Sequence, residues 1–319
     1  MIEQSVRKLT GIRSAISSIF LFTSFGPLLA GESPETLKGR RCATRLSVAI
    51  LGVPDKSLAS DPNPQSQVDR LLASEAFRER FSGFINSKFN DIPGATPDED
   101  APYSMTKYIL ENDLKWKEIF VGPYKVERLT TGQSVTARVT NDPNGLGYFR
   151  SPAWLARYAG NELTGLKLAT VYRMINNITG LNLSAVTTAP GADISAKGRE
   201  APACRKCHFD NWYALDKNAA LLSRRRPMSN PPTFEEADGQ PKEVLDGQRL
   251  RNDKEFVQAL VDSPDFIFHS CRLAFSFLYG RSENSCESSV FDSCVESFKS
   301  SGSMINALAT IAKNPSYCQ

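Results

Sequence analysis

Histidine is nearly absent from this sequence, because its 319 residues include only His208 and His269. A Ser-His-Asp hydrolase needs a histidine as general base, so the chain has little material for hydrolytic catalysis. The glycine-rich loop that binds nucleoside phosphates and the dinucleotide-binding fingerprint are also missing. These gaps direct attention to the two histidines, one of which directly follows a pair of cysteines.

A strong charge of either sign is lacking too. The formal net charge is +3, and no dense run of basic residues alternates with aromatic ones, so we expect no nucleic-acid partner. One short basic run, Arg224 to Arg226, precedes a proline. We interpret this run as a solvated turn in preference to an anion or partner site.

Long hydrophobic runs are absent except near the N-terminus. The segment "MIEQSVRKLTGIR" is basic, and the apolar run "AISSIFLFTSFGPLLA" follows it. This order is typical of a secretory signal peptide, which we predict over residues 1–30 with cleavage after Ala30. The run is short for a membrane span and contains Gly26 and Pro27. An uncleaved N-terminal anchor is the alternative and would be the only membrane contact.

The cysteines agree with export. Apart from the pair beside His208, the chain has Cys42 and a C-terminal cluster of Cys271, Cys286, Cys294 and Cys318. Such a density is typical of an oxidising compartment, so we predict a secreted, periplasmic or cell-surface protein with disulfides in the C-terminal cluster. Sequence alone does not choose among the pairings, and Cys42 is either free or part of the set. The alternative for each cysteine is a small buried hydrophobic residue.

Helical periodicity dominates the chain, and the predicted fold is mainly α. We expect an N-terminal helical domain over residues 31–145 and a second helical domain over residues 146–319, which ends in a disulfide-stapled helical module. The best strand signal is "QSVTARVT", and "RRRPMSNPPTFEEADGQPK" is typical of a loop. Helices are predicted within residues 63–89, 104–120, 151–160, 165–180, 253–263, 265–281 and 291–314.

The most specific motif is Cys204-Arg-Lys-Cys207-His208, the C-x-x-C-H pattern of c-type haem attachment. Two thiols separated by two residues at the start of a helix can each add to one vinyl group on the same porphyrin edge. The adjacent histidine then supplies its imidazole to the iron as proximal ligand. The motif therefore predicts one covalently bound haem c in the domain over residues 146–319.

Three other interpretations of the cysteine pair are weaker. A thioredoxin-like redox disulfide would need alternating strands and helices, which the pattern of the chain does not show. A zinc site would need two more ligands, from His269 and the remaining cysteines, at no recognised spacing. An ordinary disulfide would close a very tight loop.

The sixth iron ligand is open at this stage. Met228 follows the motif in the proline-rich loop, and His269 lies on an apolar helix where a lone histidine is more often a core residue. The other methionines, Met105, Met174 and Met304, are further candidates, and the position could also be open or hold water. A thioether raises the reduction potential relative to a second imidazole, whereas an open position permits ligand binding or peroxide chemistry.

Five blocks in order resemble the planctomycete-type cytochrome c-like proteins, a family of secreted modules. They are "VDRLLASEAFRERFSGFINSKF", "ENDLKWKEIFVGPYKV", "GYFRSPAWLARYA", "ACRKCHFDNWYALD" and the C-terminal "FIFHSCRLAFSFLYGRSENSC" with "FKSSGSMINALATIAKNPSYC". The resemblance covers most of the mature chain and implies a mainly helical secreted protein with one haem c on Cys204, Cys207 and His208. Asn211 and Trp212 depart from the family's Pro-Leu step after the motif.

These observations predict a single-haem electron-transfer protein that passes electrons to a redox partner protein. Basic side chains at Arg205, Lys206 and Arg224 to Arg226 are candidates for steering an acidic partner, and the alternative is that they are solvated surface charges. Two alternatives stay open. One is a haem enzyme or sensor with a vacant sixth position, with Arg173 or Tyr213 as the polar distal group. The other is a non-catalytic structural protein that uses haem to stabilise its fold.

Overall fold

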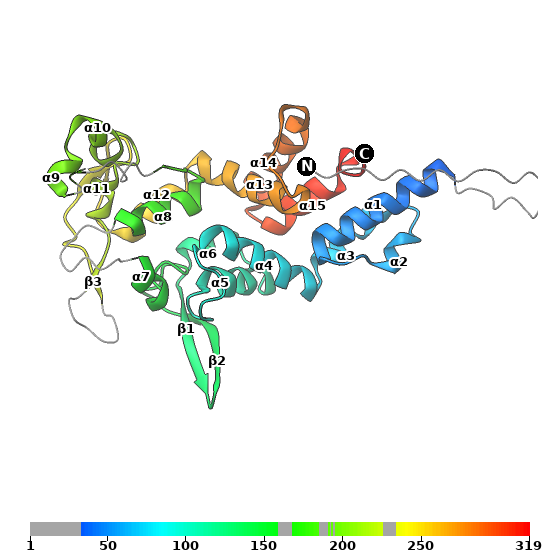
Figure 1. The fold of residues 1–319 in the computed structure, drawn as a ribbon, viewed down its shortest axis with the longest axis horizontal. Coiled ribbons are helices and arrows are strands. Elements are labelled where there is room, and N and C mark those ends of the chain that lie inside the picture. The colour runs from blue at the N-terminus through cyan, green and yellow to red at the C-terminus, as the bar shows by residue number, and fades with distance from the viewer. Residues whose placement is uncertain (1–32, 159–167, 185–190, 192, 194, 226–233) are drawn as a thin grey trace, which may run out of the picture.

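The computed structural model describes residues 33–158, 168–184, 191, 193, 195–225 and 234–319. The fold is mainly helical, as the periodicity predicted (Figure 1). The signal peptide predicted over residues 1–30 lies outside the described residues. No helix in the described part of the chain is both long enough and apolar enough to cross a membrane.

Helices form most of the described chain. The α-helices are α1 (Pro34–Leu51), α2 (Lys56–Ala59), α3 (Val68–Leu72), α4 (Glu75–Phe89), α5 (Ala101–Glu111), α6 (Glu118–Val121), α7 (Pro152–Tyr158), α8 (Leu168–Thr179), α9 (Ala196–Arg199), α10 (Pro202–Arg205), α11 (Leu215–Ala219), α12 (Asp253–Val261), α13 (Pro264–Tyr279), α14 (Ser288–Ser301) and α15 (Met304–Lys313). Short 3₁₀ turns are η1 (Pro64–Gln67), η3 (Ser285–Glu287) and η4 (Pro315–Cys318), and η2 (Lys206–Asp210) is a π turn.

Three predicted helical stretches are each divided in two. Ser74 has extended backbone, and its Oγ accepts a hydrogen bond from the Phe77 N–H, so it ends α3 and caps α4. Asp113 has a φ of 49° between α5 and α6. The expectation of one last helix over residues 291–314 is wrong, because Gly302 has a φ of 66° and separates α14 from α15.

The strands form short antiparallel hairpins. β1 (Tyr124–Thr131) pairs with β2 (Ser134–Asn141) from Tyr124↔Asn141 to Thr131↔Ser134. β2 is the predicted strand, and Gly132 with a φ of 60° makes the tight turn to its partner. Two-stranded pairings also connect β3 (Arg224–Arg225) with β4 (Phe234–Glu235) and β5 (Lys242–Val244) with β6 (Gln248–Leu250). The last two pairs lie in and just after the segment predicted as a loop.

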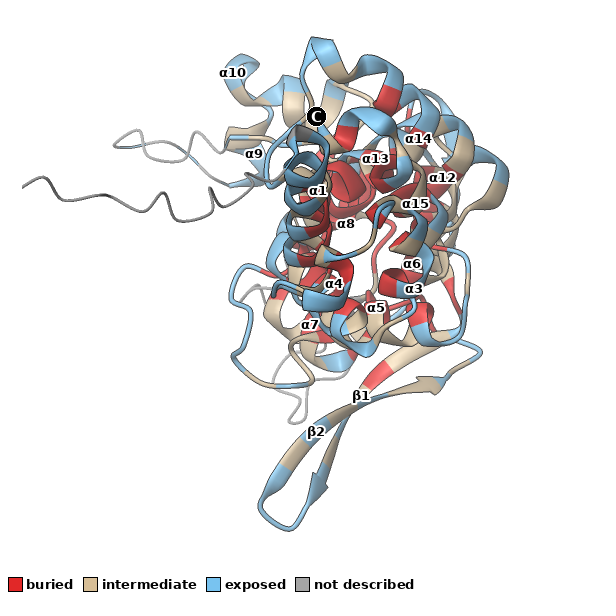
Figure 2. Ribbon diagram, turned by 90° about the vertical axis from the view of Figure 1, so that its right-hand side faces the viewer, coloured by how far each residue is buried: buried red, intermediate tan, exposed pale blue. Residues whose placement is uncertain are grey.

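Packed aromatic rings form much of the hydrophobic core. Phe81 on α4 meets Phe277 on α13 edge-to-face, with 5.0 Å between ring centroids. A second group joins Phe120, Tyr148 and Trp154 beneath α6 and α7. One continuous cluster of buried residues takes side chains from both predicted domains, and its buried faces line the interior of the helical body (Figure 2). A domain boundary at residue 145 stays a prediction.

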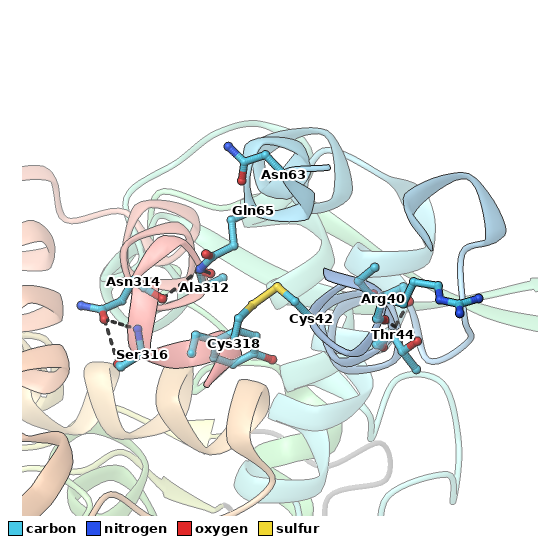
Figure 3. Close-up of a disulfide and its surroundings, with 12 residues drawn as sticks. Arg40, Cys42, Thr44, Asn63, Gln65, Ala312, Asn314, Ser316 and Cys318 are labelled. Atoms are coloured by element: carbon cyan, nitrogen blue, oxygen red, sulfur yellow. Dashed lines mark hydrogen bonds between the residues drawn. A yellow bond between two sulfur atoms is a disulfide. The ribbon is translucent and has the colours of Figure 1, made fainter. Parts of the chain in front are cut away.

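Two disulfides are present among the described residues, and they select one of the pairings that the sequence left open. Cys271 on α13 bonds to Cys294 on α14, within the C-terminal cluster. Cys318 bonds to Cys42 on α1 (Figure 3). Cys286 is unpaired and exposed. The fold brings the C-terminal end against α1, so Cys42 joins the set.

The junction of the two ends has a further polar contact. The Gln65 side-chain amide donates to the backbone carbonyls of Ala312 and Asn314, each at 2.8 Å (Figure 3). This contact joins η1 to the C-terminal end of α15, and the Cys42–Cys318 disulfide joins α1 to η4.

Candidate haem-attachment site

The cysteine motif lies on a short helical segment at one end of the molecule, beside α9 and α11 (Figure 1). Pro202 occupies the start of α10, where its missing N–H costs no hydrogen bond. Cys204 is on α10, and Cys207 and His208 are on the π turn that continues it. Such turns contain an extra residue and are frequent at functional sites.

Both thiols of the motif are free. Cys204 and Cys207 are partly exposed and form no disulfide with each other or with another cysteine. Because they are three residues apart on a helical segment, they lie on neighbouring positions of one face. This arrangement leaves both sulfurs available for covalent attachment.

A buried carboxylate holds the imidazole of His208. Nδ1 of His208 lies 2.7 Å from Oδ2 of Asp216, whose residue is 4% exposed, on α11. Nδ1 is the only ring nitrogen of His208 with a hydrogen-bond partner among the described residues. A carboxylate at Nδ1 favours the tautomer that has its N–H there, and in that tautomer Nε2 carries the free electron pair.

Arg199 on α9 completes this arrangement. Its Nη2 donates to Oδ1 of Asp216 at 2.9 Å, and its Nε lies 3.1 Å from both carboxylate oxygens. A buried carboxylate is costly unless it is paired and hydrogen-bonded. The guanidinium therefore holds the Asp216 carboxylate in place, and Asp216 orients His208.

Tyr213 contacts the second cysteine of the motif. Its hydroxyl is 3.5 Å from Sγ of Cys207 and accepts a hydrogen bond from the Asn211 side-chain amide at 2.6 Å. The hydrogen bond with Cys207 and burial raise the pKa of Tyr213, so the phenol is neutral at pH 7. Tyr213 thus adjoins the attachment sulfur.

One polar side chain close to the motif in sequence is buried without a hydrogen-bond partner among the described residues. Asn218 on α11 is fully buried, two residues after Asp216. Neither its Oδ1 nor its Nδ2 has a hydrogen-bond partner among the described residues. Five other described residues, Ser82, Trp116, Thr140, Trp154 and Asn177, also have a buried polar atom without a partner, so this amide does not by itself indicate a ligand. The motif supplies the residue types that a haem c requires, namely two free thiols and an imidazole beside a carboxylate.

The predicted sixth ligands do not share one location. His269 is on α13, where its ring lies 6.4 Å from that of Phe89. A Cβ on Gly180, at the end of α8, would overlap Nδ1 of His269. Burial, with a smaller effect of Arg272, lowers the pKa of His269 to about 4, so this imidazole is neutral at pH 7.

The four methionine candidates for the sixth ligand also lie in different parts of the chain. Met228 lies outside the described residues. Met105, Met174 and Met304 are 0–2% exposed in the hydrophobic core. Cys204, Cys207 and His208 lie together on one helical segment. The identity of the sixth ligand stays a prediction.

Two residues considered for a distal role have other partners. Arg173 on α8 forms an ion pair with Asp91 and lies 5.7 Å from the Tyr158 ring centroid. Tyr213 contacts Cys207, one of the two attachment cysteines of the motif. Arg205, one of the basic residues expected to steer a partner, pairs with Asp210 at 3.2 Å.

Sequence reasoning missed Asp216, Arg199 and Asn218. The one available signal was an aspartate eight residues after His208, on the next short helix. Nothing in the sequence shows that a turn brings this aspartate back to the imidazole.

Comparisons with protein-family models, curated proteins and solved structures find no match to this chain.

Proposed function

We propose that this protein is a single-haem c-type cytochrome that transfers electrons outside the cytoplasm. Cys204 and Cys207 would hold the haem through thioethers, and His208 would be the proximal iron ligand. The observation that carries the proposal is the Nδ1 contact of His208 with the buried Asp216, next to two unpaired thiols. A carboxylate that orients a histidine is the usual outer shell of a metal-ligating imidazole.

Each residue of the site has a distinct task in this proposal. Bound haem would supply an iron that cycles between two oxidation states. Asp216 would accept a hydrogen bond from Nδ1 and fix the ring, and Arg199 would hold the carboxylate in place. Tyr213 packs against Cys207. The partial exposure of both cysteines suits covalent attachment at a surface, where one haem edge can face a redox partner protein.

The two disulfides support export. Structural disulfides persist in secreted and periplasmic proteins and are rare in the cytosol. Haem is attached to C-x-x-C-H motifs after export, so location and chemistry agree. The block resemblance to the planctomycete-type cytochrome c-like proteins leads to the same proposal, and membership of that family stays a prediction.

One alternative gains support from the same site. A carboxylate on Nδ1 makes the imidazole a stronger donor to iron. Strong proximal donation favours haem chemistry at an open sixth position, so a ligand-binding or peroxide-reacting haem protein is the second candidate.

The decisive experiment is export of the full chain in a bacterium that attaches haem c. We expect a coloured protein that keeps one haem mass after denaturation. Cys204→Ala/Cys207→Ala should lose the colour, whereas Cys286→Ala, at the exposed unpaired cysteine, should retain it. A colourless wild-type protein without the extra mass would reject the proposal.

Spectra then separate the two candidates. Low-spin bands that carbon monoxide and cyanide leave unchanged indicate electron transfer, and a high-spin spectrum that shifts with either ligand indicates an open position. Met228→Ala and His269→Ala, tested in turn, identify the sixth ligand by the loss of the low-spin bands. If neither variant alters the spectrum, both candidates for that ligand are wrong.

A further inference from the structure

A basic groove runs along α1, the C-terminal end of α13 and the adjoining face of α4. It consists of three open hollows of about 810, 430 and 880 Å³. The first shares Arg80 and Phe277 with the second, and Leu37, Arg41 and Arg45 with the third, so the three are continuous. Among the described residues, no aspartate or glutamate side chain lines any of them.

The number of cationic side chains in the basic groove exceeds the net charge of the whole chain. Its lining includes Lys38, Arg41, Arg45, Arg80 and Lys88, whereas the full sequence has a formal net charge of only +3. These five have no ion pair with a described carboxylate. The nearby Glu287 is engaged by Arg281, with 2.8 Å between Oε2 and Nη1. Positive charge is therefore concentrated on this face.

Aromatic rings and backbone groups hold two of the arginines. The Arg45 guanidinium lies 4.9 Å from the Tyr279 ring centroid and 4.4 Å from that of Tyr317. Nε of Arg80 donates to the carbonyl of Ala49 at 2.9 Å. Stacked or anchored guanidinium groups lose less freedom when they bind a carboxylate than a free lysine does. Arg45 and Arg80 are thus preorganised for anions.

The basic groove also has an exposed apolar strip. Leu37 and Val48 on α1 are 42% and 39% exposed, and both line the first hollow. Arg41 lies between them in the helical sequence, four residues after Leu37. Spacings of three and four place Leu37, Arg41 and Val48 along one helix face. This face combines positive charge with apolar surface.

We infer that the basic groove docks an acidic segment of a partner protein, with carboxylates on Arg41 and Arg45 and apolar side chains on Leu37 and Val48. Charge complementarity sets the sign of the partner, and the exposed leucine and valine favour a polypeptide over a polar polyanion. Helix α1, which lines much of the groove, lies at the end of the molecule opposite α10 (Figure 1). A partner bound there leaves the cysteine motif accessible, and the inference holds with or without a haem.

The test uses the purified full chain and a fluorescent synthetic helical peptide with glutamates on one face and leucines on the other. We expect saturable binding at low salt, which a matched peptide with lysines in place of the glutamates does not show. Arg41→Glu should weaken binding of the acidic peptide by about tenfold. Arg41 is exposed and has no ion pair among the described residues, so this variant should fold normally.

Lys299→Glu is the matched control, because Lys299 is exposed on α14 and does not line the groove. It should bind the peptide as the wild type does. Failure of the wild type to bind the acidic peptide, or equal binding by Arg41→Glu, would overturn the inference. Arg41-dependent binding of phosphatidylglycerol vesicles without peptide binding would overturn it as well, in favour of a lipid surface.

Discussion

At the scale of single residues, the site depends on a contact between two short helical segments. The orientation of the His208 ring is defined by the contact between its Nδ1 and the Asp216 carboxylate. Arg199 in turn donates hydrogen bonds to that carboxylate. The motif was predictable from Cys204, Cys207 and His208. Asp216 and Arg199 were not, because their sequence neighbours give no sign of the fold that joins them.

We expect Asp216→Asn to raise the reduction potential of the haem-loaded protein. A neutral amide makes the His208 imidazole a weaker donor, so the ferric state loses stabilisation. A rise of about 60 mV would be a tenfold change in the oxidised-to-reduced ratio of a one-electron couple. Spectroelectrochemical titration measures it. Asp210→Asn, at an exposed carboxylate paired with Arg205, is the control, and equal potentials in the two variants would contradict the role of Asp216.

Gly180 permits the close approach of α8 and His269. Its φ is 76°, and a Cβ there would overlap the imidazole. We expect Gly180→Ala to lower the free energy of unfolding by about 2–4 kcal/mol, from left-handed backbone strain and overpacking together. Urea unfolding monitored by circular dichroism measures this loss.

Gly280→Ala is the matched control for that variant. Gly280 has a φ of 69°, but a Cβ there would meet no atom within 4 Å. It should therefore lose only the backbone part, about 1–2 kcal/mol. Equal losses at Gly180 and Gly280 would show that His269 can move away from α8 at no cost.

At the scale of elements, the periodicity located the helices but not all of their ends. The best strand signal of the sequence lies where β2 is found, and helices were predicted where α12 and α13 are found. The expected stop of α7 at Gly160 lies outside the described residues, while its start at Pro152 is confirmed. The breaks at Ser74 and Gly302 depend on one residue each, and a continuing apolar pattern on both sides conceals them.

The α13–α14 pair should depend on its disulfide. Cys271 and Cys294 are fully buried and 23 residues apart in sequence. Closing a loop of that length restricts the unfolded chain, so Cys271→Ala/Cys294→Ala should lower the free energy of unfolding by about 3 kcal/mol. Cys286→Ala, at the unpaired exposed cysteine, should change it little. Denaturant midpoints that agree between the two variants would contradict a stabilising role for this bond.

At the scale of the whole molecule, the Cys42–Cys318 disulfide joins positions 276 residues apart. Because loop-closure entropy grows with loop length, Cys42→Ala/Cys318→Ala should lose about 5 kcal/mol, more than the α13–α14 variant. Urea unfolding of both double variants under identical conditions makes the comparison. A smaller loss for the Cys42–Cys318 variant would mean that the contacts around Gln65 suffice to hold the two ends together.

Local chemistry determined much of this protein from the sequence alone. Apolar spacing specified a mainly helical fold, and the tight Cys204, Cys207 and His208 pattern specified the candidate site, because both depend on neighbours along the chain. The tertiary structure decided the Cys42–Cys318 pairing, the Asp216 contact with His208 and the gathering of cations over α1 and α13. In each case the residues come close only when separate helices pack against one another. The spacing of residues along the sequence does not predict that packing.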